Sequence, residues 1–300
     1  MRGPDTHQHS IPCCLAPRTK IMGPRFSMPV GAWDTHFHIL GPQARFPYAS
    51  NRKYTPPDAS IEQYRTVQRT LGLCGGFVVH ANTHGFDNEV DIDAAKQLGA
   101  EDHFAVVRVD SSVDSGRISA WHTQGVRGVR FAFNPQHGGD LDKALLQRTV
   151  ELISDYGWFV ELHAAPQDLV KLAPWLSLLD VRIVIDHIGR IDAALGTEQP
   201  AFEALQNLVS SRDVWVKLSG IDRLTKVGPP YADVVPFTRQ LMRLAPERMI
   251  WGSDWPHTGI FENSRMPDDA DLLNFVAEYA PNDELRTTLF VDNPRRLLRL

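Results

Sequence analysis

The stretch "ALLQRTVELISDYGWFVELHAA", residues 144–165, contains the unit from which the fold is built. Its first part is amphipathic and ends at Gly157, as helices often do at a glycine. The next eight residues, "WFVELHAA", form a short run that is mostly apolar, as expected of a buried strand. A helix followed directly by such a strand predicts one repeat of an α/β fold.

The same rhythm extends over the chain in both directions from this unit. Seven further strand-like runs lie at residues 31–38, 75–82, 103–110, 126–133, 182–189, 214–221 and 248–256. Eight strands with intervening helices in about 270 residues match a (β/α)8 TIM barrel. A doubly wound open sheet is the alternative, but no G-x-G-x-x-G follows the first strand. We therefore predict a single-domain α/β barrel over residues 29–300.

Residues 1–28 do not share this rhythm and lack the continuous apolar core of a signal peptide. We expect a short disordered N-terminal extension. The alternative is that the start codon was assigned too early, because Met28 immediately precedes the ordered pattern. No apolar run is long enough to span a membrane. The three cysteines, two of them adjacent in this extension, form no disulfide framework, so a cytoplasmic setting fits best.

The composition narrows the class of partner. A formal net charge of -5 and a pI near 6.2 give no support for nucleic-acid binding. An anionic small molecule would then need a local cluster of arginines. A homo-oligomer is compatible with the sequence, since a neighbouring barrel would cover exposed helices.

Polar side chains gather at the carboxyl ends of the predicted strands, where TIM-barrel active sites lie. In chain order these residues are His36, His38, Asn82, His84, Arg108, Arg130, His163, His187, Arg190, Ser219, Arg223, Asp254 and His257. The strand interiors are otherwise apolar, so polarity concentrated at one rim predicts an enzyme site.

His36 and His38 stand two apart on one strand and therefore project from the same face. Together with His163 and Asp254 they would hold one divalent ion, preferably zinc, and leave a position for water. Such an ion gives a hydroxide nucleophile near neutral pH. Asp254 could accept the water's proton, and His187 could polarise a carbonyl or hold the water.

Six stretches make the chain resemble the amidohydrolase superfamily, and within it the group containing 2-pyrone-4,6-dicarboxylate hydrolase. They are "DTHFHILGP", "FPYASNRKYTPPDAS", "GVRGVRF", "DHIGR", "WGSDWPH" and "LFVDNPRRL". The resemblance runs from about residue 29 to the end. It implies hydrolysis of the lactone ring of a small carboxylated or sulfonated ester, resembling 2-pyrone-4,6-dicarboxylate or a muconolactone, in aromatic or sugar-acid catabolism.

The resemblance also assigns roles to residues. It implies that Asp254 activates the water, and that His36, His38 and His187 surround the scissile carbonyl. By the same resemblance, the residues that bind the substrate's acid groups are Arg130, Arg190, Arg223 and Tyr54. Guanidinium suits this task, because it pairs with carboxylate or sulfonate through two parallel hydrogen bonds. Asn82 and His84 are further candidate contacts at the rim.

Two departures from the group's pattern affect the expected chemistry. Gln136 stands where the pyrone hydrolase carries a second arginine. The resemblance therefore does not decide whether one carboxylate of the substrate is bound here, nor which lactone the substrate is. His163 replaces a tyrosine of that enzyme, which works without metal, whereas metal-dependent relatives carry histidine there. We therefore expect a bound ion. His163 as a simple hydrogen-bond donor to substrate, with metal-independent catalysis, is the alternative.

Structural explanations compete with several of these roles. Arg130 and Arg190 could form ion pairs with Asp34 or Glu161, and Tyr54 could pack a loop. Glu161 could also accept a proton from a metal-bound histidine. At the level of function, a metal-dependent decarboxylase and a non-catalytic scaffold are the alternatives to a lactonase.

Overall fold

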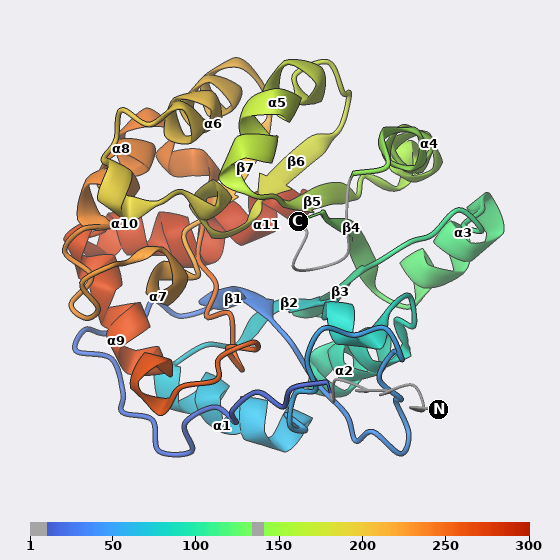
Figure 1. Cartoon of the computed structure of the whole chain (residues 1–300), viewed down its shortest axis with the longest axis horizontal. Helices are drawn as coiled ribbons and strands as arrows, with labels where there is room; N and C mark the ends of the chain where they lie inside the picture. Colours follow the sequence, from blue (N-terminus) through green and yellow to red (C-terminus); the bar gives the residue numbers. More distant parts are fainter. Residues whose placement is uncertain (1–10, 134–140) are drawn as a thin grey trace, which may run out of the picture.

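The computed structural model describes residues 11–133 and 141–300 of the chain, and the predicted barrel is confirmed (Figure 1). Eight parallel strands follow one another in the order of the sequence. A parallel bridge between Phe37 and Trp255 brings the last segment beside the first, so the sheet nearly closes. The strands are β1 (Trp33–Phe37), β2 (Gly75–Val79), β3 (His103–Val107), β4 (Val126–Ala132), β5 (Phe159–His163), β6 (Arg182–Ile185), β7 (Val214–Lys217) and β8 (Met249–Ile250).

Helices surround the strands on the outside (Figure 1). They are α1 (Ile61–Leu71), α2 (Glu89–Gly99), α3 (Ser115–Thr123), α4 (Lys143–Ile153), α5 (Pro166–Leu176), α6 (Pro200–Ser211), α7 (Ile221–Leu224), α8 (Val235–Leu244), α9 (Asp269–Asn274), α10 (Asp283–Thr287) and α11 (Asn293–Leu298). α1 shows how local sequence sets these bounds: Ser60 and Gln63 form a capping box, and Gly72 ends the helix in the left-handed conformation. Among the described residues, we find no helix with the length and apolar character that crossing a membrane requires.

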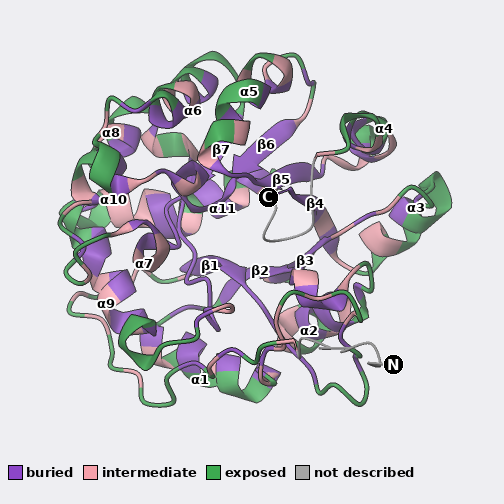
Figure 2. Ribbon diagram, viewed as in Figure 1, coloured by how far each residue is buried: buried purple, intermediate pink, exposed green. Residues whose placement is uncertain are grey.

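The barrel interior changes from apolar to charged along its axis. Phe159 and Trp215 belong to an apolar cluster inside the barrel, and Leu297 of α11 packs into the same cluster. Side chains two residues apart on a strand point the same way, so Glu161 and Lys217 also point inward. Both are fully buried. Figure 2 shows buried strands at the centre and exposed surfaces on the outer helices. Charged groups thus lie between the apolar layer and the rim.

The predicted disorder of the N-terminal extension is wrong for residues 11–28. Ile21, Phe26 and Met28 pack against the hydrophobic core, and the Arg25 backbone N–H donates to Asn274 Oδ1 at 2.7 Å. These apolar residues are too sparse to form a helical or strand period, yet they anchor an irregular chain on the barrel. Residues 1–10, and Gln136 with its open carboxylate contact, lie outside the described residues.

Candidate active site

A pocket at the carboxyl ends of the strands brings together the residues for which a role is predicted, except His36 and His84; Arg108, Ser219 and His257 of the predicted rim do not line it either. Its lining consists of His38, Tyr54, Ala81, Asn82, Arg130, His163, His187, Arg190, Arg223, Asp254 and Thr258. His36 lies just beneath, fully buried. His84 is buried against Tyr48, with ring centroids 5.0 Å apart, and takes no part in the lining.

Asp254 stands at the centre of this pocket, and its two carboxylate oxygens have different surroundings. Oδ2 accepts a hydrogen bond from Arg223 Nε at 2.7 Å. Oδ1 faces the Nε2 atoms of three histidines, 3.6 Å from His36, 3.5 Å from His38 and 3.8 Å from His187. One oxygen is therefore neutralised by a guanidinium, while the other is directed at a ring of imidazoles.

Two of these imidazoles are fixed through their Nδ1 atoms. His38 Nδ1 lies 2.7 Å from the Val79 carbonyl oxygen, which can only accept, so Nδ1 carries the proton. The Nε2 lone pair of a neutral His38 then faces Asp254. His187 Nδ1 lies 2.8 Å from Ser219 Oγ. Gly220 makes room for this ring: its φ is 61°, and a Cβ there would lie 2.8 Å from His187 Nδ1.

The turn that carries His187 and Arg190 has an unusual backbone. His187, Ile188 and Arg190 have φ values of 51°, 52° and 55°, in the left-handed region that non-glycine residues rarely adopt. Asp254 has a φ of 62°. Such conformations cost free energy and persist only where the surrounding structure enforces them. Three of these residues, His187, Arg190 and Asp254, line the pocket.

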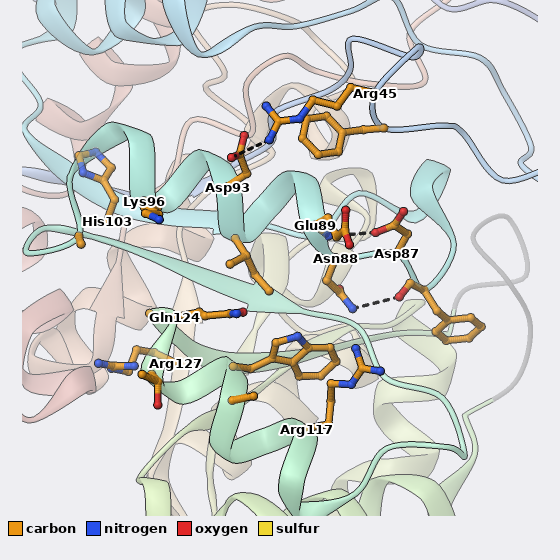
Figure 3. Close-up of a pocket in the computed structure, with 18 of the residues that line it drawn as sticks. Arg45, Asp87, Asn88, Glu89, Asp93, Lys96, His103, Arg117, Gln124 and Arg127 are labelled. Atoms are coloured by element: carbon orange, nitrogen blue, oxygen red, sulfur yellow. Dashed lines mark hydrogen bonds and ion pairs between the residues drawn. The ribbon is translucent and has the colours of Figure 1, made fainter.

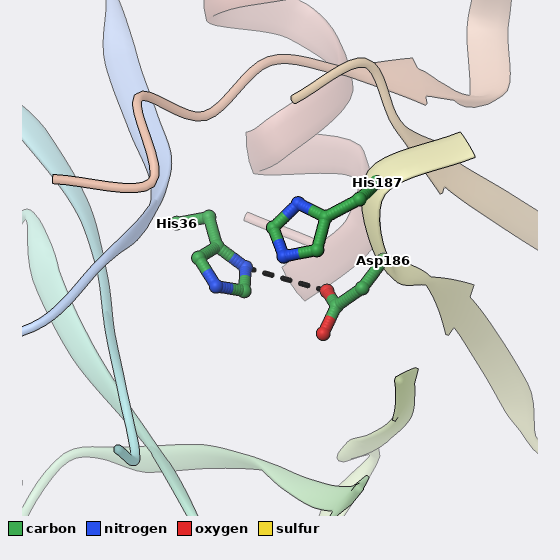
Figure 4. A group of neighbouring side chains, drawn as sticks. All are labelled: His36, Asp186 and His187. Atoms are coloured by element: carbon green, nitrogen blue, oxygen red, sulfur yellow. Dashed lines mark ion pairs between the residues drawn. The ribbon is translucent and has the colours of Figure 1, made fainter. Parts of the chain in front are cut away.

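His36 rests on a buried network of charges. Its Nδ1 lies 3.0 Å from Lys217 Nζ, 3.3 Å from Asp186 Oδ1 and 3.5 Å from Glu161 Oε1. Figure 4 shows the His36 ring directed at Asp186, with His187 beside it. A charged Lys217 can only donate, which suits an Nδ1 without a proton. The carboxylates of Asp186 and Glu161 can only accept, which suits an Nδ1 that carries one. The network therefore supports either tautomer of His36.

Arg130 completes the network. Its guanidinium donates to Asp186 Oδ2 at 2.9 Å and lies 3.3 Å from Glu161 Oε1, while Lys217 also pairs with Glu161. The ion pair expected for Arg130 thus forms with Glu161 and Asp186. Asp34 instead accepts hydrogen bonds within the β1 to β8 junction, including one from Ser253 Oγ at 2.6 Å.

His163 differs from the other histidines of the pocket. Arg130 Nη2 lies 3.0 Å from His163 Nδ1, and a guanidinium only donates, so Nδ1 accepts and Nε2 of the neutral ring carries the proton. Among the described residues, two groups have ligand atoms close enough to share an ion. One is His36, His38 and Asp254, and the other is His36, Asp186 and His187. His163 belongs to neither group.

Besides Asp254 and the histidines, the pocket carries a group of cationic and polar residues, which we call its cationic side: Arg190, Arg223, Tyr54 and Thr258. Arg190 is half-buried and has no hydrogen bond or ion pair to any residue in the described part of the chain. Burial and the positive charge of Arg223 lower the pKa of Arg190. Tyr54 donates to Thr258 Oγ1 at 2.8 Å, and Arg223 Nη2 donates to the Thr258 carbonyl at 3.1 Å. An anion bound here would relieve the repulsion between the two guanidiniums.

Burial and charge set the protonation of the central groups. Burial lowers the pKa of His187 to about 4. Burial and the Lys217 charge hold the pKa of His36 well below its ordinary value. For Asp254, burial alone would raise the pKa, but the positive charge of the neighbouring Arg223 acts against it, and the pKa lies well below its ordinary value. At neutral pH the site thus combines neutral His36 and His187 with an ionised Asp254.

Sequence reasoning missed three residues of the site. Lys217 and Asp186 underlie His36, and Thr258 joins Tyr54 to Arg223. A signal existed for the first two, because each is a charged residue at the end of an apolar strand, in "VWVKLSG" and "RIVIDHIGR". Thr258 lies in a loop whose path the sequence does not indicate.

A much larger cavity than the pocket around Asp254 lies elsewhere. It has a volume of about 1110 Å³ and is lined by residues of α2 and α3, among them Lys96, Arg117 and Trp121 (Figure 3). It shares no lining residue with the pocket around Asp254. Its size therefore does not identify the catalytic site.

Comparisons with known proteins agree with the fold and show the family. The amidohydrolase family matches residues 33–300. The chain is 45% identical to a 4-sulfomuconolactone hydrolase of Rhizobium radiobacter over 291 residues, 97% of either chain. It is 38% identical to a 2-pyrone-4,6-dicarboxylate hydrolase of Comamonas testosteroni, covering 91% of this chain and 92% of that one. A crystal structure from Agrobacterium tumefaciens superimposes with a TM-score of 0.83 at 28% identity, covering 92% of this chain and 98% of that one.

Proposed function

The chain belongs to the amidohydrolase family and is an enzyme, and from this premise we propose that it is a lactonase. Its substrate is a small cyclic ester that bears carboxylate or sulfonate groups, of the kind formed in aromatic catabolism. The observation that carries this proposal is the pairing of two functions in one pocket. Asp254 Oδ1 faces three histidines, and the guanidiniums of Arg190 and Arg223 line the same pocket.

Substrate binding follows from the cationic side of the pocket. Arg190 has no partner among the described residues and is available for an acid group of the lactone. Arg223 and Tyr54 meet at Thr258 and would contact the same region. Asn82 lines the pocket, and its buried Oδ1 lacks a hydrogen-bond partner among the described residues. A direct contact of Arg130 with substrate stays a prediction, since most of its N–H groups already serve the buried network.

Ring opening needs a base, a nucleophile and stabilisation of negative charge. Asp254 Oδ1 accepts a proton from a water molecule as the water oxygen attacks the lactone carbonyl carbon. The acyl carbon–oxygen bond of the ring then breaks, and the leaving oxygen takes up the proton as an alcohol or enol. Imidazole groups beside the carbonyl, His187 and the Nε2–H of His163, would stabilise the developing oxyanion.

We further propose that one divalent ion, zinc, binds at His36, His38 and Asp254. The buried Nε2 of His36 has no hydrogen-bond partner among the described residues, and His38 Nε2 directs its lone pair at Asp254 Oδ1, so a cation would satisfy all three. When bound, zinc acidifies water and polarises a carbonyl. Asp186 would then accept the Nδ1 proton of His36. Elemental analysis of the protein purified without added metal tests this proposal, and a metal-free protein with full activity would contradict it.

We propose a cytoplasmic location, supported by three cysteines that form no disulfide. The proposed partner is the anionic lactone alone, without nucleic acid or membrane. A homo-oligomer stays a prediction.

To test the lactonase proposal, the protein is assayed with a panel of lactones, and ring opening is measured as the loss of their ultraviolet absorbance. The panel contains 2-pyrone-4,6-dicarboxylate, 4-sulfomuconolactone and a neutral lactone of similar size. We expect turnover of an acidic lactone and a loss of about 10²–10⁴-fold in kcat for Asp254→Asn. Undiminished turnover in that variant would sink the mechanism. A product that has lost carbon dioxide would favour the decarboxylase instead.

A further inference from the structure

The segment before the barrel reaches the rim of the active site. We call residues 11–18 the N-terminal strap. Thr55 is held by the strap on both sides: its N–H donates to the Pro12 carbonyl at 2.8 Å, and its carbonyl accepts from the Cys14 N–H at 3.0 Å. This is the pattern of a short parallel β-bridge, formed between Cys13 and Thr55. The strap is therefore paired with the residue that follows Tyr54.

The other half of the strap is tied to the loop after β8. The Leu15 N–H donates to the Ile260 carbonyl at 2.8 Å. The Arg18 side chain donates to the carbonyls of Met266 at 2.9 Å and Pro267 at 3.0 Å. Ile260 lies two residues after Thr258, the residue that accepts from Tyr54 and Arg223. One short segment thus joins the two loops whose side chains meet at the cationic side of the pocket.

The strap is built into the protein rather than laid on its surface. Cys14 is only 7% exposed, and Pro17 is also buried. The alignment with the 4-sulfomuconolactone hydrolase of Rhizobium radiobacter covers 291 of the 300 residues. It therefore extends well into residues 11–28, so that relative has a corresponding segment.

We propose that the N-terminal strap is a positioning element for substrate binding, which fixes Tyr54, Thr258 and through them Arg223 at the pocket. This inference rests on the proposed lactonase function. None of the strap residues lines the pocket, and within residues 11–133 and 141–300 no hydrogen bond joins the strap to Asp254 or to the histidines around it. Loosening it should therefore weaken binding of the substrate's acid group and leave the chemical step almost unchanged.

The test uses the full chain with the double substitution Leu15→Pro and Arg18→Met. Proline removes the N–H that donates to Ile260, and methionine removes the guanidinium while keeping length. The matched control is Cys13→Pro, which places a proline in the same strap at an exposed residue whose N–H donates no hydrogen bond to the described residues. Circular dichroism and thermal unfolding of both variants establish that the barrel is folded.

Two readouts decide the outcome. Hydrogen exchange should accelerate about tenfold or more in peptides spanning residues 54–55 and 258–260 of the double variant, but not in the control. The KM for an acidic lactone should rise about tenfold with kcat within about twofold, while the KM for a neutral lactone stays the same. Unchanged exchange, or an equal KM for the acidic lactone, would overturn the inference. Failure of the lactonase proposal would appear separately, as an unmodified protein that opens no lactone.

Discussion

Replacing Lys217 with methionine tests the buried network beneath His36. Methionine preserves most of the side-chain volume and removes the positive charge. The ammonium is fully buried, pairs with Glu161, and lies 3.7 Å from Asp186 Oδ1 and 3.0 Å from His36 Nδ1. Without it, Arg130 alone balances two buried carboxylates.

The expected magnitude follows from this geometry. Removing one partner of a buried ion pair costs about 3–5 kcal/mol of folding free energy. For a chain of 300 residues, an unfolding entropy of about 2.1 cal/mol/K per residue converts this loss into a fall in Tm of about 5–8 °C. Thermal unfolding followed by circular dichroism measures it. The control is Lys226→Met, since that exposed lysine pairs with Asp192 at the surface and should change stability by less than about 1 kcal/mol.

A double variant separates lost charge from lost packing. Lys217→Met combined with Glu161→Gln removes one charge of each sign. The loss of unfolding free energy in this double variant should therefore be smaller than the sum of the two single losses by about 1 kcal/mol or more. Strict additivity, or a Lys217→Met protein as stable as the Lys226→Met control, would refute the reasoning.

Three further predictions concern the pocket itself. Because burial lowers the pKa of His187 to about 4, folding favours its neutral form. The contribution of the neutral His187 to folding stability is complete above about pH 6.5 and is lost as the pH falls toward 4. Denaturant titrations at pH values from 7 to 4 should therefore show that the free energy of unfolding falls by about 2–4 kcal/mol more in the wild type than in His187→Asn. Parallel curves of unfolding free energy against pH for the two proteins would contradict this. Arg190→Met should raise the KM of an acidic lactone about 10–100-fold and leave the KM of a neutral lactone and the Tm unchanged. The control Arg243→Met, at an exposed residue, should change neither KM. Gly220→Ala should lower kcat, because its Cβ would lie 2.8 Å from His187 Nδ1, whereas Gly196→Ala, with a φ of 69° and open space, should lower stability alone. Equal kcat values for the two alanine variants would contradict the steric argument.

The sequence predicts the eight strands because each run is apolar, short and followed by a helical pattern. It also predicts most of the pocket, since residues at the carboxyl ends of parallel strands must meet at one rim. Asp254 and His187 were found this way, although they lie far apart in the chain. His84, a candidate rim contact, does not line the pocket, because the position of a strand end does not tell which way a side chain turns after the strand.

Other features depend on contacts between distant segments. Arg130 was expected to bind substrate or to pair across the rim, and only the barrel geometry brings Asp186 within 2.9 Å of it. The left-handed turn at His187 has no sequence signal, because non-glycine residues adopt it only under tertiary constraint. The strap was missed for a related reason: its bonds are made by backbone groups, which leave no pattern of side chains.

The central claim is that Asp254 directs water onto a lactone carbonyl. Its most direct test is to react an acidic lactone with the protein in ¹⁸O-labelled water and to analyse the product by mass spectrometry. The account predicts a ring-opened acid that contains one ¹⁸O in the new carboxylate, formed by the wild type and almost abolished in Asp254→Asn. A product without the label, or label incorporated equally fast by the variant, would contradict it.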